Sequence, residues 1–159
     1  MSGEDKNAHI GEIKIGSGDD HLHCLLGSCV GVAFLWKKKD LYGLAHCLLP
    51  YPPKETDSLS SRFVNQAVLL LIEKMGIGLS DYRNIEVILA GGANMTKPLD
   101  TPNEKLVGFM NSEQATASIK KLKLRVIHTD FGGHFGRKIT INCSDSSFNI
   151  KILPREIAA

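Results

Sequence analysis

The chain has 159 residues, of which 43% are hydrophobic, and its 19 basic and 17 acidic residues give a net charge of +2. This size and apolar content fit a single globular domain that needs no disulfide bonds. The balanced charge argues against a nucleic-acid-binding surface, and the lysine run at 37–39, followed at once by Asp40, is typical of a solvated turn.

The N-terminal residues are polar, without the apolar segment of a signal peptide, and no apolar stretch is long enough to span a bilayer. We therefore expect a cytoplasmic protein with no membrane insertion. In that compartment cysteines remain thiols, and no Cys-x-x-Cys pair suggests a zinc or redox site. The four cysteines are Cys24, Cys29, Cys47 and Cys143.

The first part of the chain predicts a flexible N-terminus over residues 1–10, followed by one domain over 11–155. Residues 12–15 alternate like a short edge strand. The stretch 21–26 also alternates, which places Leu22 on one face and His23 on the other.

Two further strands are predicted at 30–36 and 41–49. The connection between them is too short for a crossover helix, so the strands should pair antiparallel. His46 and Cys47 then face opposite ways, and if His46 points into a site, Cys47 belongs to the core.

The second half of the chain predicts two helices among several strands. The stronger helix spans about 60–75 and is stopped by Gly76. Asn111 and Gln114 resemble a capping pair that opens the second helix after a surface loop over 96–110. The strands are expected at 85–90, 124–130, 138–143 and 148–153. Because helices and strands do not alternate strictly, we expect an α+β sandwich and not a doubly wound fold.

The chemistry centres on a turn at Gly27 and Ser28 that delivers Cys29 at the mouth of an apolar strand. A free thiol is mostly protonated at neutral pH, and a nearby imidazole or a cluster of backbone N–H groups activates it. The antiparallel pairing would bring His46 alongside. Buried cysteines usually behave as small hydrophobic residues, and we keep that interpretation for Cys24, Cys47 and Cys143.

A set of motifs in fixed order resembles the CheD family of chemoreceptor glutamine deamidases, over roughly 13–153. The combination is far more specific than any single motif. The motifs are Leu25-Leu26-Gly27-Ser28-Cys29-Val30, Gly43-Leu44-Ala45-His46-x-Leu48-Leu49-Pro50, Arg62-Phe63-Val64-Asn65-Gln66-Ala67, Gly91-Gly92-Ala93-Asn94-Met95 and Asp130-x-Gly132-Gly133-x-x-Gly136-Arg137.

The resemblance implies a hydrolase, a protein-glutamine glutaminase, that converts glutamine side chains on methyl-accepting chemotaxis receptors to glutamate. It implies an α+β layered sandwich of mixed β-sheets flanked by helices, similar to the catalytic domain of cytotoxic necrotizing factor. The family's catalytic cysteine falls on Cys29 and its histidine on His46. Their thioester chemistry requires no metal or organic cofactor, and backbone N–H groups of Ser28 and Cys29 are the expected oxyanion donors.

His23 stands where the family has its third catalytic residue, a threonine. One interpretation is an exposed strand histidine in an enzyme that is weakened or inactive. Another is that the ring of His23 reaches the site and orients His46 or supplies a second proton-transfer group. A metal pair with His21 is a third option, but no further ligand is evident nearby.

The paired glycines at 91–92 and 132–133 are explained by turn geometry in preference to a catalytic role. Asn94, His134 and Arg137 remain candidates for lining a substrate groove. No metal site is assigned.

The main alternative to an enzyme is a CheD-like binding module that regulates receptors or a CheC-type phosphatase. The substitution of His23 for threonine beside an intact Cys29 and His46 is the feature that raises it. A thiol peptidase is a third class, without a family signature in this sequence. Chemotaxis receptors, and a CheC-type phosphatase, are the expected partners.

Overall fold

The computed structural model describes residues 3–155. Its strands are β1 (Asp5–Asn7), β2 (Ile13–Gly16), β3 (His21–Leu26), β4 (Val30–Trp36), β5 (Leu41–Cys47), β6 (Glu86–Gly91), β7 (Arg125–Phe131), β8 (Gly136–Asn142) and β9 (Ser147–Leu153). The α-helices are α1 (Val64–Met75) and α2 (Val107–Leu122), and the 3-10 helices are η1 (Lys37–Lys39), η2 (Leu79–Asn84) and η3 (Asn103–Lys105).

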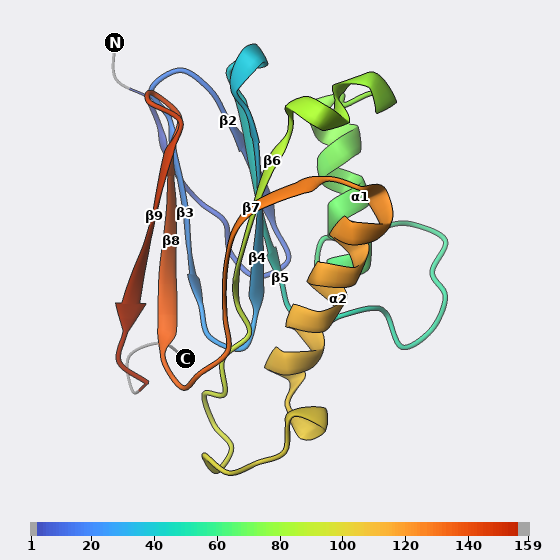
Figure 1. Cartoon of the computed structure of the whole chain (residues 1–159), viewed down its shortest axis with the longest axis vertical. Coiled ribbons are helices and arrows are strands. Elements are labelled where there is room, and N and C mark those ends of the chain that lie inside the picture. The colour runs from blue at the N-terminus through green and yellow to red at the C-terminus, as the bar shows by residue number, and fades with distance from the viewer. Residues whose placement is uncertain (1–2, 156–159) are drawn as a thin grey trace.

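These elements form three layers (Figure 1). One sheet has the strand order β1-β3-β8-β9, the other has the order β2-β5-β4-β6-β7, and α1 and α2 cover the outer face of the second sheet. Each sheet contains one parallel pair, β1 with β3 and β6 with β7. The expected α+β architecture with mixed sheets in layers is therefore confirmed.

The strands that carry the cysteine and histidine motifs have the predicted arrangement. β3 and β4 have the predicted bounds, and β4 pairs antiparallel with β5 through the short connection that contains η1. All seven residues of β4 are buried because the strand lies in the middle layer, with the other sheet on one face and the helices on the other.

Strand alternation divides the interior into two apolar cores. The inter-sheet core lies between the two sheets and includes Leu22, Cys24, Leu26, Cys29, Ala33, Leu44, Ile88 and Ile139. The helix-facing core lies between the five-stranded sheet and the helices and includes Val32, Phe34, Cys47, Leu71, Leu89 and Ile119. Cys29 and Cys47 thus belong to different cores.

Both helices begin at residues other than those predicted. Phe63 is extended and bridges Leu49, so α1 begins at Val64 and not at residue 60; it ends before Gly76, whose positive φ of 67° forms the expected stop. α2 begins at Val107, inside the expected loop, and Asn111 lies within the helix. The interpretation of Asn111 as a helix cap is therefore wrong.

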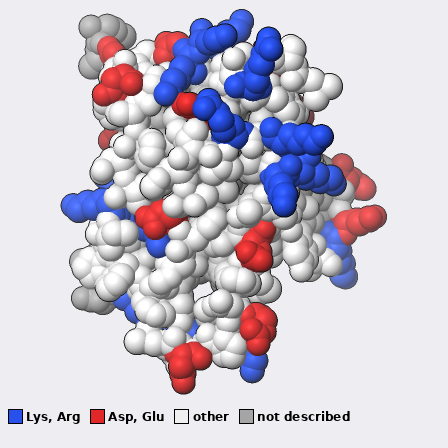
Figure 2. Space-filling model, in the orientation of Figure 1, with Lys and Arg blue, Asp and Glu red and all other residues white. Residues whose placement is uncertain are grey.

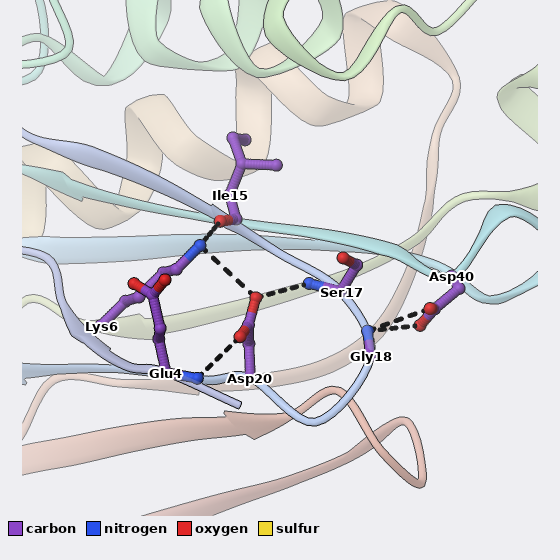
Figure 3. Close-up of polar contacts among 7 residues, drawn as sticks. All are labelled: Glu4, Lys6, Ile15, Ser17, Gly18, Asp20 and Asp40. Atoms are coloured by element: carbon purple, nitrogen blue, oxygen red, sulfur yellow. Dashed lines mark hydrogen bonds and ion pairs between the residues drawn. The ribbon is translucent and has the colours of Figure 1, made fainter. Parts of the chain in front are cut away.

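The N-terminal segment is also ordered where the sequence predicted flexibility. Residues 5–7 form β1, which pairs with β3, and Ala8 is only 1% exposed. Asp20 anchors this segment, because its carboxylate accepts the Glu4 N–H at 2.8 Å and faces the Lys6 ammonium at 3.4 Å (Figure 3). The prediction of flexibility is wrong for residues 5–8, while residues 1–2 lie outside the described part.

Basic side chains gather toward the upper end of the face shown in Figure 2. η1, which is made of three lysines, lies at that end of the molecule, just after β4 (Figure 1). Cys29 lies at the other end of β4, just before its first residue. The basic end therefore lies away from the candidate nucleophile. Within residues 3–155, neither α-helix combines the length and the apolar character needed to cross a membrane.

Candidate active site

The turn at residues 27–29 connects the two sheets, from the end of β3 to the start of β4. Cys29 is 6% exposed and packs at the edge of the inter-sheet core. Gly91 lies against it so closely that a Cβ on Gly91 would sit 2.2 Å from the Cys29 carbonyl oxygen, and its φ is 111°. A glycine is needed at this position, which confirms the explanation of this glycine pair by backbone geometry.

All three carbonyl groups of this turn accept hydrogen bonds from other segments. The Gly27 carbonyl accepts the Ala93 N–H at 3.0 Å, and the Cys29 carbonyl accepts the Gly92 N–H at 2.9 Å. The Ser28 carbonyl accepts the side-chain Nδ2 of Asn111 at 3.0 Å. Within residues 3–155, the N–H groups of Ser28 and Cys29 donate to no acceptor. Fixed, unpaired N–H groups beside a thiol are suited to bind a developing oxyanion.

His46 lies on the same face of the five-stranded sheet as Cys29. It stands opposite Gly31, which has no side chain, so the register makes Cys29 its diagonal neighbour across β4 and β5. The backbones of such diagonal neighbours are about 7–8 Å apart across the two strands, which is within reach of longer side chains. The predicted pairing of the two strands and the opposite orientation of Cys47 are both confirmed.

The His46 ring is held in one tautomer. Its Nδ1 lies 2.8 Å from the Ala8 carbonyl oxygen, which can only accept, so Nδ1 carries the proton and Nε2 keeps its lone pair. The side chain is 5% exposed, and this burial lowers the pKa of His46 below its usual 6.5. Near neutral pH the imidazole is therefore an uncharged base.

The Cys29 thiol is protonated at rest, because burial raises its pKa to about 11. The other three thiols are shifted further: burial raises the pKa of Cys143 to about 12, and the pKa values of Cys24 and Cys47 rise more. All four cysteines are free thiols, as predicted. Cys29 is thus the thiol that ionises most readily, and it needs a base to accept its proton.

The ring of His23 does not hydrogen-bond to the ring of His46, which corrects the hypothesis that it orients His46 directly. β3 turns Leu22 and Cys24 into the inter-sheet core, so His23 faces the other side of its sheet. There its Nε2 lies 2.9 Å from the Asp5 carboxylate. Among the described residues, no three metal-ligating side chains cluster around it or elsewhere.

Of the three groove candidates, Asn94 and His134 line a cavity of about 410 Å³ next to Gly92. The Asn94 amide is occupied within its own loop, where it donates to the Pro98 carbonyl and accepts the Lys97 N–H. The His134 Nδ1 is buried without a partner among the described residues. His134 is therefore the better candidate for contacting a bound group.

Arg137 does not line that cavity and is 5% exposed. Its guanidinium donates to the Asp130 carboxylate at 3.2 Å and to the Gly91 carbonyl at 3.4 Å. Gly91 in turn packs on Cys29. Arg137 thus holds together the strand ends that pack against Cys29.

Asn111 is the site residue that sequence reasoning missed. It is completely buried, and its Nδ2 donates to the carbonyls of both Ser28 and Leu48 at 3.0 Å. It therefore links the turn at residues 27–29 to the end of the strand that carries His46. A signal was present, because Asn111 is a polar residue on the buried helix face that also carries Ala115 and Ile119.

Comparison with known proteins identifies the family of the chain. The family model described as CheD chemotactic sensory transduction matches residues 48–152. A protein of Ruegeria sp. named probable chemoreceptor glutamine deamidase CheD 2 is 38% identical, over 94% of this chain and 92% of its own length. A probable chemoreceptor glutamine deamidase CheD of Bdellovibrio bacteriovorus is 34% identical over 94% and 95%, and one of Methanococcus maripaludis is 34% identical over 89% and 91%. The chain belongs to the CheD family.

Proposed function

We propose that this protein is a protein-glutamine deamidase that hydrolyses glutamine side chains of chemoreceptors to glutamate, with Cys29 as the nucleophile. The names of the relatives support the reaction and the substrate class. The observation that supports the assignment to residues is the turn at 27–29, which lies on the same sheet face as His46. Its carbonyls all accept hydrogen bonds, and the N–H groups of Ser28 and Cys29 have no acceptor among residues 3–155.

The first half of the reaction forms a thioester. As the Cys29 sulfur attacks the carboxamide carbon, its proton passes to Nε2 of His46. The N–H groups of Ser28 and Cys29 stabilise the oxyanion of the tetrahedral intermediate. His46 then returns the proton to the departing nitrogen, and ammonia leaves as the C–N bond breaks.

The second half hydrolyses the thioester. His46 takes a proton from a water molecule, which attacks the same carbonyl carbon through a second oxyanion. The C–S bond breaks, the sulfur regains its proton from His46, and the side chain is now a glutamate. The neutral thiol and the neutral imidazole of the resting site are the forms that this cycle requires at its start.

The alternative of an inactive binding module rests on the loss of the family threonine at His23. The hydrogen bond from His46 to Ala8 weakens that alternative, because the catalytic imidazole is oriented without a side chain at position 23. The same proposal includes three further points that rest on the motif resemblance. They are a likeness to the cytotoxic necrotizing factor domain, a cytoplasmic location and a CheC-type phosphatase as a partner.

The test is ammonia release from the purified cytoplasmic fragment of a chemoreceptor, with the converted glutamine located by mass spectrometry. The unaltered protein should release ammonia, Cys29→Ala should release none, and Cys143→Ala is the matched control because it removes a thiol outside the site. Equal release by Cys29→Ala would contradict the proposal. Free glutamine should be a poor substrate, since the exposed loop around Leu99, beside the cavity, is available to contact a folded receptor surface.

A further inference from the structure

The N-terminal segment, residues 5–12, hydrogen-bonds to both the ring and the backbone of His46. The Ala8 carbonyl accepts the proton of the His46 ring at 2.8 Å. Beyond it, the Gly11 N–H donates to the His46 carbonyl at 2.8 Å, and the His46 N–H donates to the Glu12 carbonyl at 3.0 Å. Ring and backbone of His46 are therefore both bound by one short stretch of chain.

We propose that this segment, which we call the positioning strap, fixes the tautomer and orientation of His46 and so takes the place of an orienting side chain. The inference rests on the proposed function and extends it from the reacting residues to the chain that positions them. A backbone carbonyl can perform this role because it is an obligate acceptor: it holds Nδ1–H and leaves Nε2 as the base.

His23 serves the strap as an anchor. Its backbone carbonyl accepts the Ala8 N–H at 2.9 Å, and its ring lies 2.9 Å from the Asp5 carboxylate in β1. Both contacts join β3 to the strap. The residue at the family's threonine position thus supports His46 indirectly, through Ala8.

Asp20 is the second anchor. Its two carboxylate oxygens accept the N–H groups of Glu4 and Ser17, and Lys6 faces the same carboxylate while donating to the Ile15 carbonyl (Figure 3). These contacts tie the start of the strap to the turn before β3. Asp40, in the same view, accepts the Gly18 N–H (Figure 3). Among residues 3–155 no hydrogen bond or ion pair joins its side chain to the strap, which makes it a matched control.

The first test measures the tautomer of His46 by ¹⁵N NMR of the ring in the full-length, unaltered protein. The proton is expected on Nδ1, with Nε2 unprotonated at neutral pH. A ring protonated on Nε2 would overturn the proposal. This readout needs no substrate, so it separates failure of the strap from failure of the proposed deamidase activity.

The second test compares variants of the full chain. Ala8→Pro removes the N–H that bonds to His23, and Asp20→Asn leaves one acceptor oxygen for two N–H groups. For Ala8→Pro we expect kcat on a receptor fragment to fall roughly tenfold or more with little change in KM, since misplacing a catalytic group slows the chemical step. Asp20→Asn should show a smaller fall, and Asp40→Asn should match the parent.

If Ala8→Pro fails to fold, the ¹⁵N spectrum of the His46 ring in Asp20→Asn still tests the proposal. A mixture of His46 tautomers in a folded Asp20→Asn protein, together with the lower kcat, would support the strap. An unchanged spectrum and kcat in both variants, or an equal fall in Asp40→Asn, would overturn it.

Discussion

The two faces of the hairpin formed by β4 and β5 give Cys29 and Cys47 different surroundings. Val30 pairs directly with Cys47, so Cys29 and Cys47 lie close together in the hairpin of β4 and β5, on opposite faces. Cys47 is completely buried among apolar side chains of the helix-facing core. Cys29 lies at the edge of the inter-sheet core, on the same face as His46, and in the described part of the chain its own N–H and that of Ser28 have no acceptor. Strand alternation thus separates a packing residue from a candidate nucleophile.

The largest expected effects come from removing the thiols of Cys29 and Cys47 separately, which tests whether the two residues have different roles. Cys29→Ala should abolish deamidation while changing the free energy of unfolding little. Cys47→Ala should keep most of the activity and lower the free energy of unfolding by about 1–2 kcal/mol, because it leaves a cavity in a packed core. Ammonia release and urea denaturation measure the two effects. A Cys47→Ala protein that is stable but inactive would contradict the division.

Asn111 tests the polar contacts that distinguish the Cys29 side. Asn111→Ala leaves the buried carbonyls of Ser28 and Leu48 without their donor, so we expect a loss of about 2 kcal/mol in unfolding free energy and a fall in kcat of roughly 10- to 100-fold. The matched control is Gln114→Ala on the same helix, because the Gln114 side chain hydrogen-bonds to Ser118 of that helix. Equal kcat values in the two variants would remove Asn111 from the site.

Alkylation compares the thiols in the unaltered protein. Because thiolate is the reactive form, and burial raises the pKa of Cys29 less than that of the other three thiols, iodoacetamide should modify Cys29 faster than the others. Peptide mapping after brief labelling at neutral pH gives the four rates. Faster modification of Cys24, Cys47 or Cys143 would argue against Cys29 as the nucleophile.

The smallest expected effect is in the pH dependence. Burial lowers the pKa of His46, so the acidic limb of the kcat profile should have its midpoint below the usual 6.5. The unfolded chain protonates this ring at a higher pH than the folded chain does. Its contribution to stability is therefore complete above about pH 6.5 and is lost as the pH falls toward the folded pKa. A midpoint at or above 6.5 would show that the imidazole is not desolvated.

The amino-acid sequence by itself determined the hairpin that carries the site. Alternating and apolar runs predicted β3 and β4 at their observed bounds, the antiparallel partner strand, and the opposite orientations of His46 and Cys47. Gly76 was predicted to end the first helix, and it does. These features follow from local rules: side-chain period, turn length and the conformational freedom of glycine.

Only the tertiary structure decided what holds the site in place. The Ala8 carbonyl that orients His46 has no side-chain signature, because every residue before it and after it carries the same group. Asn111 looked like a helix cap because its contacts, the carbonyls of Ser28 and Leu48, are distant in sequence. The sequence position of His23 suggested a catalytic role, but the pairing of β1 with β3 places its ring against the Asp5 carboxylate. Hydrogen bonds between distant segments depend on how the layers pack, and no local pattern encodes that packing.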